Sequence, residues 1–340
     1  MSDVDWLPLT YNCSQVGIVF SILNNCTLLA LLSRKQAREL GTYKYLMATF
    51  CVFGMFYSSV EWFLEPLMHI HDDTMFIIQR KRLDYNSVVA RIFSSTYCGC
   101  FATSFTLFAV HFIYRYLAVC NGKRLSWFEG FRYPLWLVGV FCIAFSWSVF
   151  AYYCFPKSDR IAKAFKEVVT LSYNMTINQT DYVPYTYWKY EKNVRILNIW
   201  SMVGLFQHVV IMSISYGIVF FCGIQTAIHL KKSDVFSGRT KELQNQLFYA
   251  LVIQTVLPTL FMYFPASMVL LFPFAGLNIG AWANMTIVSV HLYPGIEPLV
   301  IIILIKDFRK TVLLTIIRVL KCSRTRAVEP SASYQVPTTS

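Results

Sequence analysis

The sequence predicts an all-α membrane protein, in which a seven-transmembrane helix bundle is followed by a short amphipathic helix. Of its 340 residues, 56% are hydrophobic and only 14% are charged, whereas a soluble domain carries about 25% charged residues. The apolar residues come in blocks long enough to span a bilayer, which takes about 20 residues each. Because backbone groups in hydrocarbon must bond within their own segment, we interpret each block as a helix.

The apolar blocks divide the chain into four parts. We expect spans at about 14–32, 45–68, 90–115, 134–155, 197–228, 246–272 and 281–305. Residues 1–13 are then an extracellular N-terminus, 14–305 the bundle, 306–322 an amphipathic helix on the inner leaflet, and 323–340 a disordered cytoplasmic tail. Cys322, at the end of the amphipathic helix, is a candidate for palmitoylation.

Basic residues set the expected orientation. If the N-terminus is outside, most Lys and Arg lie in the short inner segments, as the positive-inside rule requires. The net charge of +12 then suits membrane lipid or an acidic partner, and its scatter over the span ends argues against nucleic acid. Three glycosylation sequons, at Asn12, Asn174 and Asn178, all fall outside in this topology. We therefore expect a multi-pass plasma-membrane protein.

The third span has one distinctive face. Helical spacing places Tyr97, Phe101, Ser104, Phe108, His111 and Arg115 on the same side. One end of this stripe is aromatic, its middle carries a hydroxyl group, and its other end is a permanent cation. Such a helix suits the transmission of a binding event across a membrane. His111 is either functional, as polar residues in spans often are, or simply a packed and hydrogen-bonded histidine.

Two carboxylates lie near the outer end of the second span. A carboxylate at mid-bilayer costs about 2.5–3.5 kcal/mol, so Glu61 and Glu65 should face the bundle or water. Arg91 is the expected partner, and a carboxylate that reaches the lipid headgroups is an equally good interpretation. In the fourth span, Trp147 and other aromatic residues near its ends suit the interfacial belts.

The remaining features leave alternatives open. The Tyr-rich segment 156–195 is long for a loop and is either a lid over the bundle or a glycosylated spacer. A disulfide from the third span, at Cys98 or Cys100, to Cys154 is one option. Proline at Pro258 and Pro294 should bend the sixth and seventh spans. The sequence contains no metal-ligand spacing, phosphate loop or nucleophile motif, so we expect no metal, no cofactor and no enzyme activity.

Several phrases of the chain resemble one receptor family. They are LGTYKYLM at 40–47, CFATSF at 100–105, HFIYRY at 111–116, QLF at 246–248, FMY at 261–263 and YPG at 293–295. The chain is similar, over nearly its whole length, to the nematode seven-transmembrane G-protein-coupled chemoreceptors of the Str class, the class of the diacetyl odorant receptor. The resemblance implies an olfactory receptor with a small volatile odorant as ligand, a heterotrimeric G protein as partner, and the cilium of a chemosensory neuron as location.

The resemblance also implies a set of switch residues. The set comprises His111, Tyr114, Arg115, Tyr116, Pro258, Tyr293 and Pro294. Compared with rhodopsin-like receptors, Tyr114 replaces the acidic residue before the arginine, Ala90 lies near the place of the usual cysteine, and Tyr293 replaces the Asn of the Asn-Pro phrase. The inactive-state contact of Arg115 must therefore use another partner.

The expected ligand site is an apolar cavity in the outer half of the bundle. Helix phase and the bend at Pro258 assign to it Tyr97, Phe101, Ser104, Thr259 and Tyr263, although ordinary helix packing explains each of them as well. Two other functions stay open. One is a peptide or pheromone receptor that uses the outer Tyr-rich segment, and the other, less favoured, is a seven-span ligand-gated channel.

Overall fold

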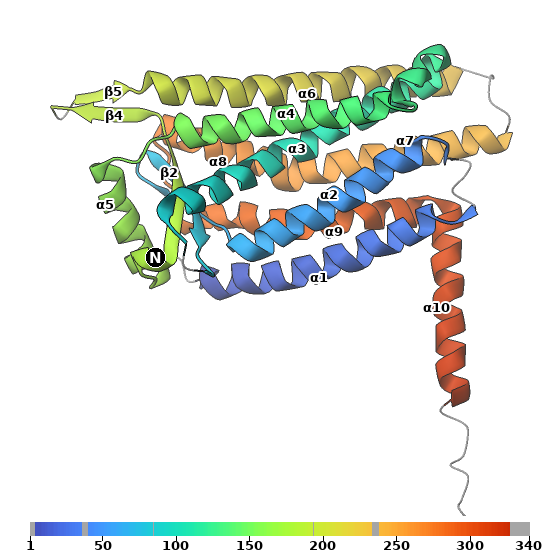
Figure 1. Cartoon of the computed structure of the whole chain (residues 1–340), viewed down its shortest axis with the longest axis horizontal. Helices are drawn as coiled ribbons and strands as arrows, with labels where there is room; N and C mark the ends of the chain where they lie inside the picture. Colours follow the sequence, from blue (N-terminus) through green and yellow to red (C-terminus); the bar gives the residue numbers. More distant parts are fainter. Residues whose placement is uncertain (1–3, 36–39, 84, 193, 233–237, 327–340) are drawn as a thin grey trace, which may run out of the picture.

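A computed structural model describes residues 4–35, 40–83, 85–192, 194–232 and 238–326. In these residues, seven helical segments are long and apolar enough to span a membrane. They are α1 (Trp6–Leu32), α2 (Tyr43–Leu64), α3 (Ser87–Cys120), α4 (Arg132–Tyr153), α6 (Ile199–Lys232), the segment formed by α7 (Gly238–Pro258), η5 (Thr259–Tyr263) and α8 (Phe264–Ala275), and α9 (Asn284–Leu304). The predicted seven-helix bundle is confirmed, and its helices run side by side along the long axis (Figure 1).

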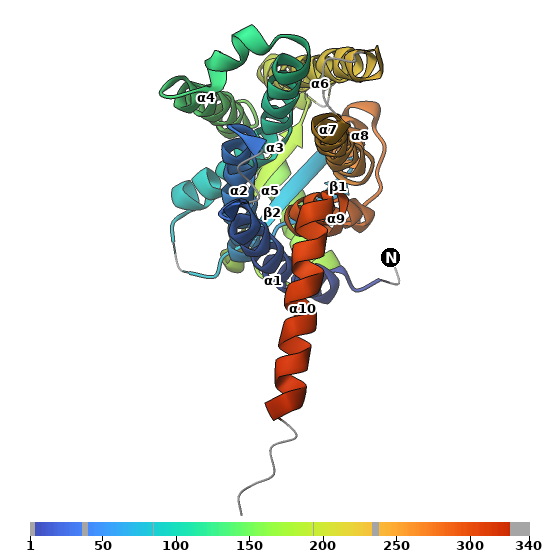
Figure 2. The same ribbon diagram turned by 90° about the vertical axis from the view of Figure 1, so that its right-hand side faces the viewer.

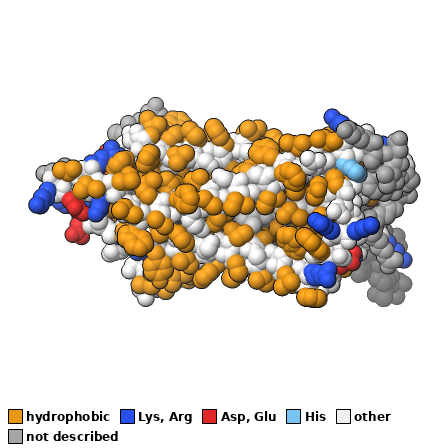
Figure 3. All heavy atoms as spheres, turned by 90° about the horizontal axis from the view of Figure 1, so that it is seen from above, with side chains coloured by type: hydrophobic (Ala, Val, Ile, Leu, Met, Phe, Trp, Pro, Cys, Tyr) orange, Lys and Arg blue, Asp and Glu red, His pale blue; other side chains and the backbone are white. Residues whose placement is uncertain are grey.

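The surface of the bundle matches a protein that sits in lipid. Apolar side chains cover the middle of the face seen in Figure 3, and charged side chains gather towards its two ends. Helix α3 lies deepest, with 78% of its apolar window buried, whereas the corresponding figure for α4 is 17%. The helix that carries the predicted stripe is therefore the central element, and α4 offers most of its surface to the bilayer.

Prolines interrupt the regular backbone bonding of the sixth and seventh spans, whereas the predicted bends stay a prediction. Helix α7 ends at Pro258 and continues as a five-residue π-helical turn, η5, a local widening that is typical of bends in helices. In α9, Pro298 has no N–H group to offer to the carbonyl oxygen of Pro294, four residues earlier. Asn25 of α1 donates its side-chain Nδ2 to that oxygen at 2.9 Å. The bond joins the first and seventh spans and replaces the one that proline removes.

One end of the bundle carries β structure that an all-α prediction omits. Strands β1 (Leu67–His71), β2 (Thr74–Arg80) and β3 (Thr180–Thr186) form an antiparallel sheet in that order, with Phe76 opposite both His69 and Pro184. Strands β4 (Trp188–Glu191) and β5 (Val194–Leu197) form a separate hairpin, and the short helix α5 (Asp159–Glu167) packs beside the sheet. These segments thus build a folded cap at that end of the bundle.

Two pairing expectations are wrong. Glu65 forms ion pairs with Arg80 and Arg82, both from the β2 region, and not with Arg91. Arg91 instead donates to the main-chain oxygens of Tyr152 and Phe155 at the end of α4. The disulfide option fails as well, because Cys98, Cys100 and Cys154 are all free thiols.

Helix α10 (Lys306–Arg326) leaves the bundle at the end opposite the cap and runs across the axes of the other helices (Figures 1 and 2). Phe308 is buried against the bundle, whereas Ile316 and Ile317 are about half exposed. This direction suits a helix that lies in the plane of the membrane surface. The side chain of Cys322 and residues 327–340 of the expected tail lie outside the described part of the chain.

Candidate functional site

A cavity of about 70 Å³ lies in the half of the bundle nearer the cap, next to the three-stranded sheet. Its walls come from α2, α3, α4, α6, α8 and α9, and its roof comes from the three-stranded sheet. Tyr97 and Phe101 line it, as predicted from helix phase, together with Trp147, Tyr185 and His208. An aromatic cavity of this size fits a small molecule and is well below the roughly 300–1,000 Å³ of sites for drug-sized ligands.

The roof of the cavity is made by side chains of the sheet. Strands β1 and β2 contribute Met68, Met75 and Ile77 to the cavity lining, and β3 contributes Tyr185. Because residues alternate between the two faces of a strand, the other face of this sheet packs against α5, where Phe165 stacks on Tyr182 with ring centroids 3.9 Å apart. The sheet is therefore a two-sided layer that lies between the cavity and α5.

Polar contacts fix the sheet to the bundle. Asn284, at the start of α9, accepts a hydrogen bond from the main-chain N–H of Met68 at 2.8 Å and donates to the hydroxyl of Tyr173 at 2.8 Å. The same hydroxyl lies 3.1 Å from Nδ1 of His69. Burial, with a smaller contribution from His71, lowers the pKa of His69 to about 4, so this histidine is neutral at physiological pH.

A few polar groups line the cavity or bond to residues that line it. The His208 ring lies on Trp147, with centroids 3.9 Å apart, and its Nε2 is 3.5 Å from the hydroxyl of Tyr185. The hydroxyl of Tyr57 is buried and has no hydrogen-bond partner among the described residues. Tyr97 donates to Glu61 at 3.5 Å, and the other oxygen of Glu61 is 3.6 Å from Nδ1 of His291. The site thus combines an apolar body with a small number of hydrogen-bonding groups.

The other predicted ligand residues lie on the side of the cavity away from the sheet. Tyr263 donates to the hydroxyl of Ser104 at 2.8 Å, and its ring packs edge-on against Phe101 at 5.5 Å. Thr259 lies 3.4 Å from the hydroxyl of Tyr216 on α6. The structure therefore brings Ser104 and Tyr263 together as a layer beneath the cavity floor and places Thr259 in a helix contact.

At the opposite end of α3, Arg115 is almost completely buried, with 1% of its surface exposed. Its guanidinium donates to the main-chain oxygen of Gln244, on α7, at 2.9 Å and lies 5.5 Å from the ring of Tyr43. The ring of Tyr114 stacks on Tyr43 at 5.2 Å. A permanent cation is thus held between an aromatic face and a backbone carbonyl, and no described carboxylate pairs with it.

Comparison with known proteins identifies the family. A family model described as "Serpentine type 7TM GPCR chemoreceptor Str" matches residues 10–313. The protein named serpentine receptor class r-10 of Caenorhabditis elegans is 37% identical over 345 residues, covering 99% of this chain and 100% of the relative. Its Caenorhabditis briggsae namesake is 38% identical and the Caenorhabditis elegans G-protein coupled receptor str-33 is 28% identical, each covering 90% of both chains.

The chain belongs to the Str family of serpentine chemoreceptors. It is a multi-pass membrane protein of a family of receptors rather than enzymes. In this Str receptor, the missing acidic partner of Arg115 is replaced by the Gln244 carbonyl and the Tyr43 ring. His111, one turn before, lies between Tyr43 and Phe50, with ring centroids 5.6 and 5.2 Å away.

The other switch residues lie at helix contacts of this Str receptor. Tyr116 packs against Phe221 of α6 at 6.0 Å, and Tyr293 lies 6.4 Å from Tyr263. Pro258 immediately precedes the π turn η5, and the carbonyl of Pro294 accepts from Asn25. The predicted switch residues therefore connect α3, α6, the sixth span and α9, and their role in coupling stays a prediction.

Sequence reasoning missed several residues of the cavity. Trp147 was expected in an interfacial belt but is 3% exposed and forms a wall of the cavity. Its position near the middle of the fourth span was the available signal. The roof residues Met68 and Met75 gave no signal, because nothing local in the sequence shows that their strands fold over the bundle.

Proposed function

We propose that this protein is a chemosensory receptor that binds a small, mostly apolar odorant in the cavity beneath the sheet and signals to a heterotrimeric G protein. The observation that carries the proposal is that α3 both lines this aromatic cavity and carries the buried Arg115. Tyr97 and Arg115 are 18 residues apart, which corresponds to about 27 Å along α3. One rigid helix therefore reaches from the ligand site to the opposite end of the bundle.

The proposed orientation has the N-terminus outside, with the sensory cilium as the location of the receptor. The sequons at Asn174 and Asn178 are exposed and lie at the capped end, so both can carry glycans there. Asn12 is exposed too, although it lies within α1 and not before it. The basic residues of the loops next to α4 and α10 lie at the other end, which suits the cytoplasmic side.

The cavity favours a small ligand over a peptide or pheromone that docks on the outer surface. Strand β3, from the Tyr-rich segment, is part of the closed roof, and Tyr187 donates to the main-chain oxygen of Leu270 at 2.8 Å. A volume of about 70 Å³ accommodates a few heavy atoms, since a single water molecule needs about 10–15 Å³ by the same measure. A ligand-gated channel is the less favoured hypothesis. Ionic current from purified protein without G protein would support it.

The test has two parts. Cells that express the receptor are screened with volatiles by a calcium or cAMP readout, and the variant Arg115→Ala is then compared with wild type at matched surface expression. We expect Arg115→Ala to reach the surface and to lose the response, because it removes the cation exposed when α7 moves away. A normal ligand-driven response in that variant would refute the coupling role, and responses to peptides alone would refute the ligand class.

A further inference from the structure

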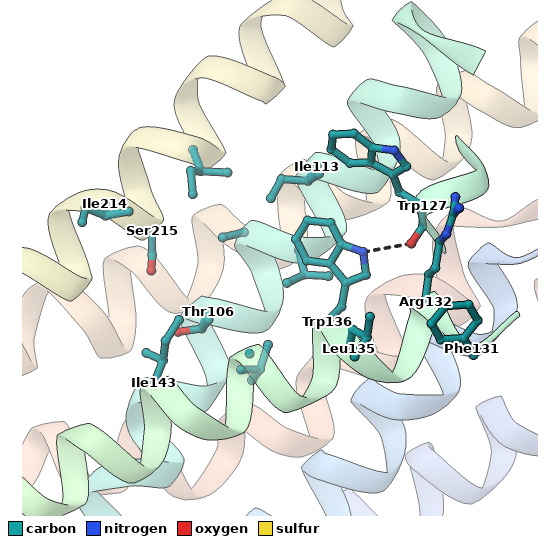
Figure 4. Close-up of a pocket in the computed structure, with 15 residues that line it drawn as sticks. Thr106, Ile113, Trp127, Phe131, Arg132, Leu135, Trp136, Ile143, Ile214 and Ser215 are labelled. Carbon is teal, nitrogen blue, oxygen red and sulfur yellow. Dashed lines mark hydrogen bonds between the residues drawn. The ribbon is translucent and has the colours of Figure 1, made fainter. Parts of the chain in front are cut away.

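A second, larger cavity lies on the lipid-facing side of the bundle. It is a groove of about 630 Å³ between α3, α4 and α6, near the end opposite the cap (Figure 4). Ile113, Val140 and Ile214 are among its apolar lining residues, and Val140 is a buried part of its floor. Leu135, at the rim, is 58% exposed. The groove therefore opens towards the space that the bilayer fills.

A cation lies at one end of this groove. Arg132 is the first residue of α4, and in Figure 4 it lies beside Trp127 and Phe131, away from Ile143 and Ile214. Its side chain is exposed and has no hydrogen-bond or ion-pair partner within the part of the chain that the structure describes. A guanidinium at the edge of the membrane binds phosphate well, because its planar donors match two phosphate oxygens.

The wall beside the cation is already ordered. Trp136 donates its indole N–H to the main-chain oxygen of Trp127 at 3.1 Å, as Figure 4 shows, and its ring stacks on Phe128 with centroids 4.8 Å apart. Phe128 itself is completely buried. These contacts hold the indole upright without help from any occupant, which reduces the entropic cost of binding.

The length of the groove suits one lipid chain. From Arg132 to Ile143 the groove follows α4 for about 16 Å, at 1.5 Å per residue. This is about half of the 30 Å hydrocarbon thickness, or one leaflet. A similar groove of about 690 Å³ lies between α2, α3 and α4 towards the cap, and its described lining residues include no charged side chain. Arg132 therefore distinguishes the first groove from an ordinary gap between helices.

We propose that the groove is a binding site for an anionic phospholipid, with its phosphate on Arg132 and one acyl chain along α4 towards Ile143. Arg132 is the one charged side chain among the described lining residues, and no carboxylate lies among them to hold a choline group, so a lipid with net negative charge fits better than a zwitterionic one. The one-leaflet length of the groove suits a single acyl chain. This proposal does not depend on the proposed odorant or G protein. The proposed orientation decides only that the lipid belongs to the inner leaflet.

Gly139 allows the groove to be filled selectively. A Cβ atom at this position would meet no protein atom within 4 Å, and the same holds for Gly217, which is exposed on α6 and is not a lining residue. Gly139→Phe should therefore block the groove without disturbing the fold, and Gly217→Phe is its matched control. Arg132→Gln removes the cation and leaves the apolar part intact.

The experiment titrates delipidated full-length receptor in detergent with phosphatidylserine or phosphatidylcholine and counts bound lipids by native mass spectrometry. We expect tighter binding of phosphatidylserine by wild type and by Gly217→Phe, and about tenfold weaker binding by Gly139→Phe and Arg132→Gln. Equal affinities for the two lipids, unchanged by Arg132→Gln, would overturn the proposal. So would saturable sterol binding that Gly139→Phe abolishes while phosphatidylserine binding persists.

A second measurement is independent of folding in the variants. Wild-type receptor is irradiated with a phosphatidylserine that carries a photoreactive acyl chain, and the crosslinked peptides are identified. We expect the crosslinks to concentrate between Leu135 and Ile143. Crosslinks spread evenly over the lipid-facing helices would contradict a defined site.

Discussion

Replacement of Asn25 by Ala tests how the seventh span tolerates its proline. Asn25 is completely buried, and its Nδ2 lies 2.9 Å from the main-chain oxygens of both Pro294 and Ser21. In a regular helix, the oxygen of Pro294 would accept from residue 298, which here is a proline without an N–H group. In Asn25→Ala the Pro294 oxygen is therefore left without a donor inside the bundle.

The cost follows from this geometry. A buried acceptor left without its hydrogen bond costs about 1–3 kcal/mol, and measured bonds between membrane helices are worth about 0.6 and at most about 1.7 kcal/mol. We expect Asn25→Ala to lower the free energy of unfolding by about 1–2 kcal/mol. Pro298→Ala restores an N–H group for the same oxygen, so the loss should shrink by about 1 kcal/mol in that background.

The assay is a double-mutant cycle on unfolding of the detergent-purified receptor. The matched control is Asn24→Ala, since Asn24 donates to the oxygen of Gly295 at 3.1 Å, and Leu299 retains its own N–H for that oxygen. We expect coupling to Pro298→Ala for Asn25 and none for Asn24. The reasoning would be refuted if Asn25→Ala lowered the free energy of unfolding by the same amount in the wild-type background and in the Pro298→Ala background.

Three further predictions concern the cap and the cavity. Acidification from pH 7.5 to 5 should lower the free energy of unfolding by about 2 kcal/mol through His69. The pKa of His69 is lower in the folded than in the unfolded protein, so stability decreases as the pH falls below about 6.5. The variant His69→Gln should flatten the pH dependence of the unfolding temperature. Glu65→Gln should speed amide hydrogen exchange in β1 and β2 but not in α9, because it removes the ion pairs with Arg80 and Arg82. Unchanged exchange rates in β1 and β2 would show that these ion pairs do not stabilise the sheet. Trp147→Ala should enlarge the cavity and weaken the response to the smallest agonist about tenfold, read as a shift in its dose–response curve, and an unshifted curve would place the ligand elsewhere.

The bundle could be predicted from the sequence because membrane insertion leaves little choice. Each apolar block has to satisfy its own backbone, so composition alone gives the spans to within several residues. The cap could not be predicted in this way. Strand β2 pairs with β3, about 100 residues later, and Ile77 opposite Val183 is a contact that no local pattern encodes. The strands also continue directly from the apolar end of α2, where Leu67 reads as part of the span.

The candidate site was partly accessible to the same reasoning. Helix phase placed Tyr97 and Phe101 correctly, because the spacing of residues on one helix fixes their common face. The ion-pair partners of charged groups could not be predicted in this way. Several arginines lie close to Glu65 in the sequence, and their expected depth in the membrane does not show which of them pairs with it. The contact of Arg115 with Gln244 is less visible still, since its acceptor is a backbone oxygen that any residue would provide.

The contacts of Tyr263 connect the two ends of the molecule more directly than α3 alone. Tyr263 packs on Phe101 at the cavity floor, donates to Ser104, and is the last residue of the π turn η5. Below that turn, α7 carries the Gln244 carbonyl that holds Arg115. We therefore expect a ligand that displaces Phe101 to disturb η5, where the backbone of the sixth span departs from a regular α-helix, and we expect α7 to convey that change to Arg115. A ligand can shift such an equilibrium only by its difference in affinity for the two arrangements of η5, so we expect substitutions that loosen the packing of Tyr263 to change agonist efficacy.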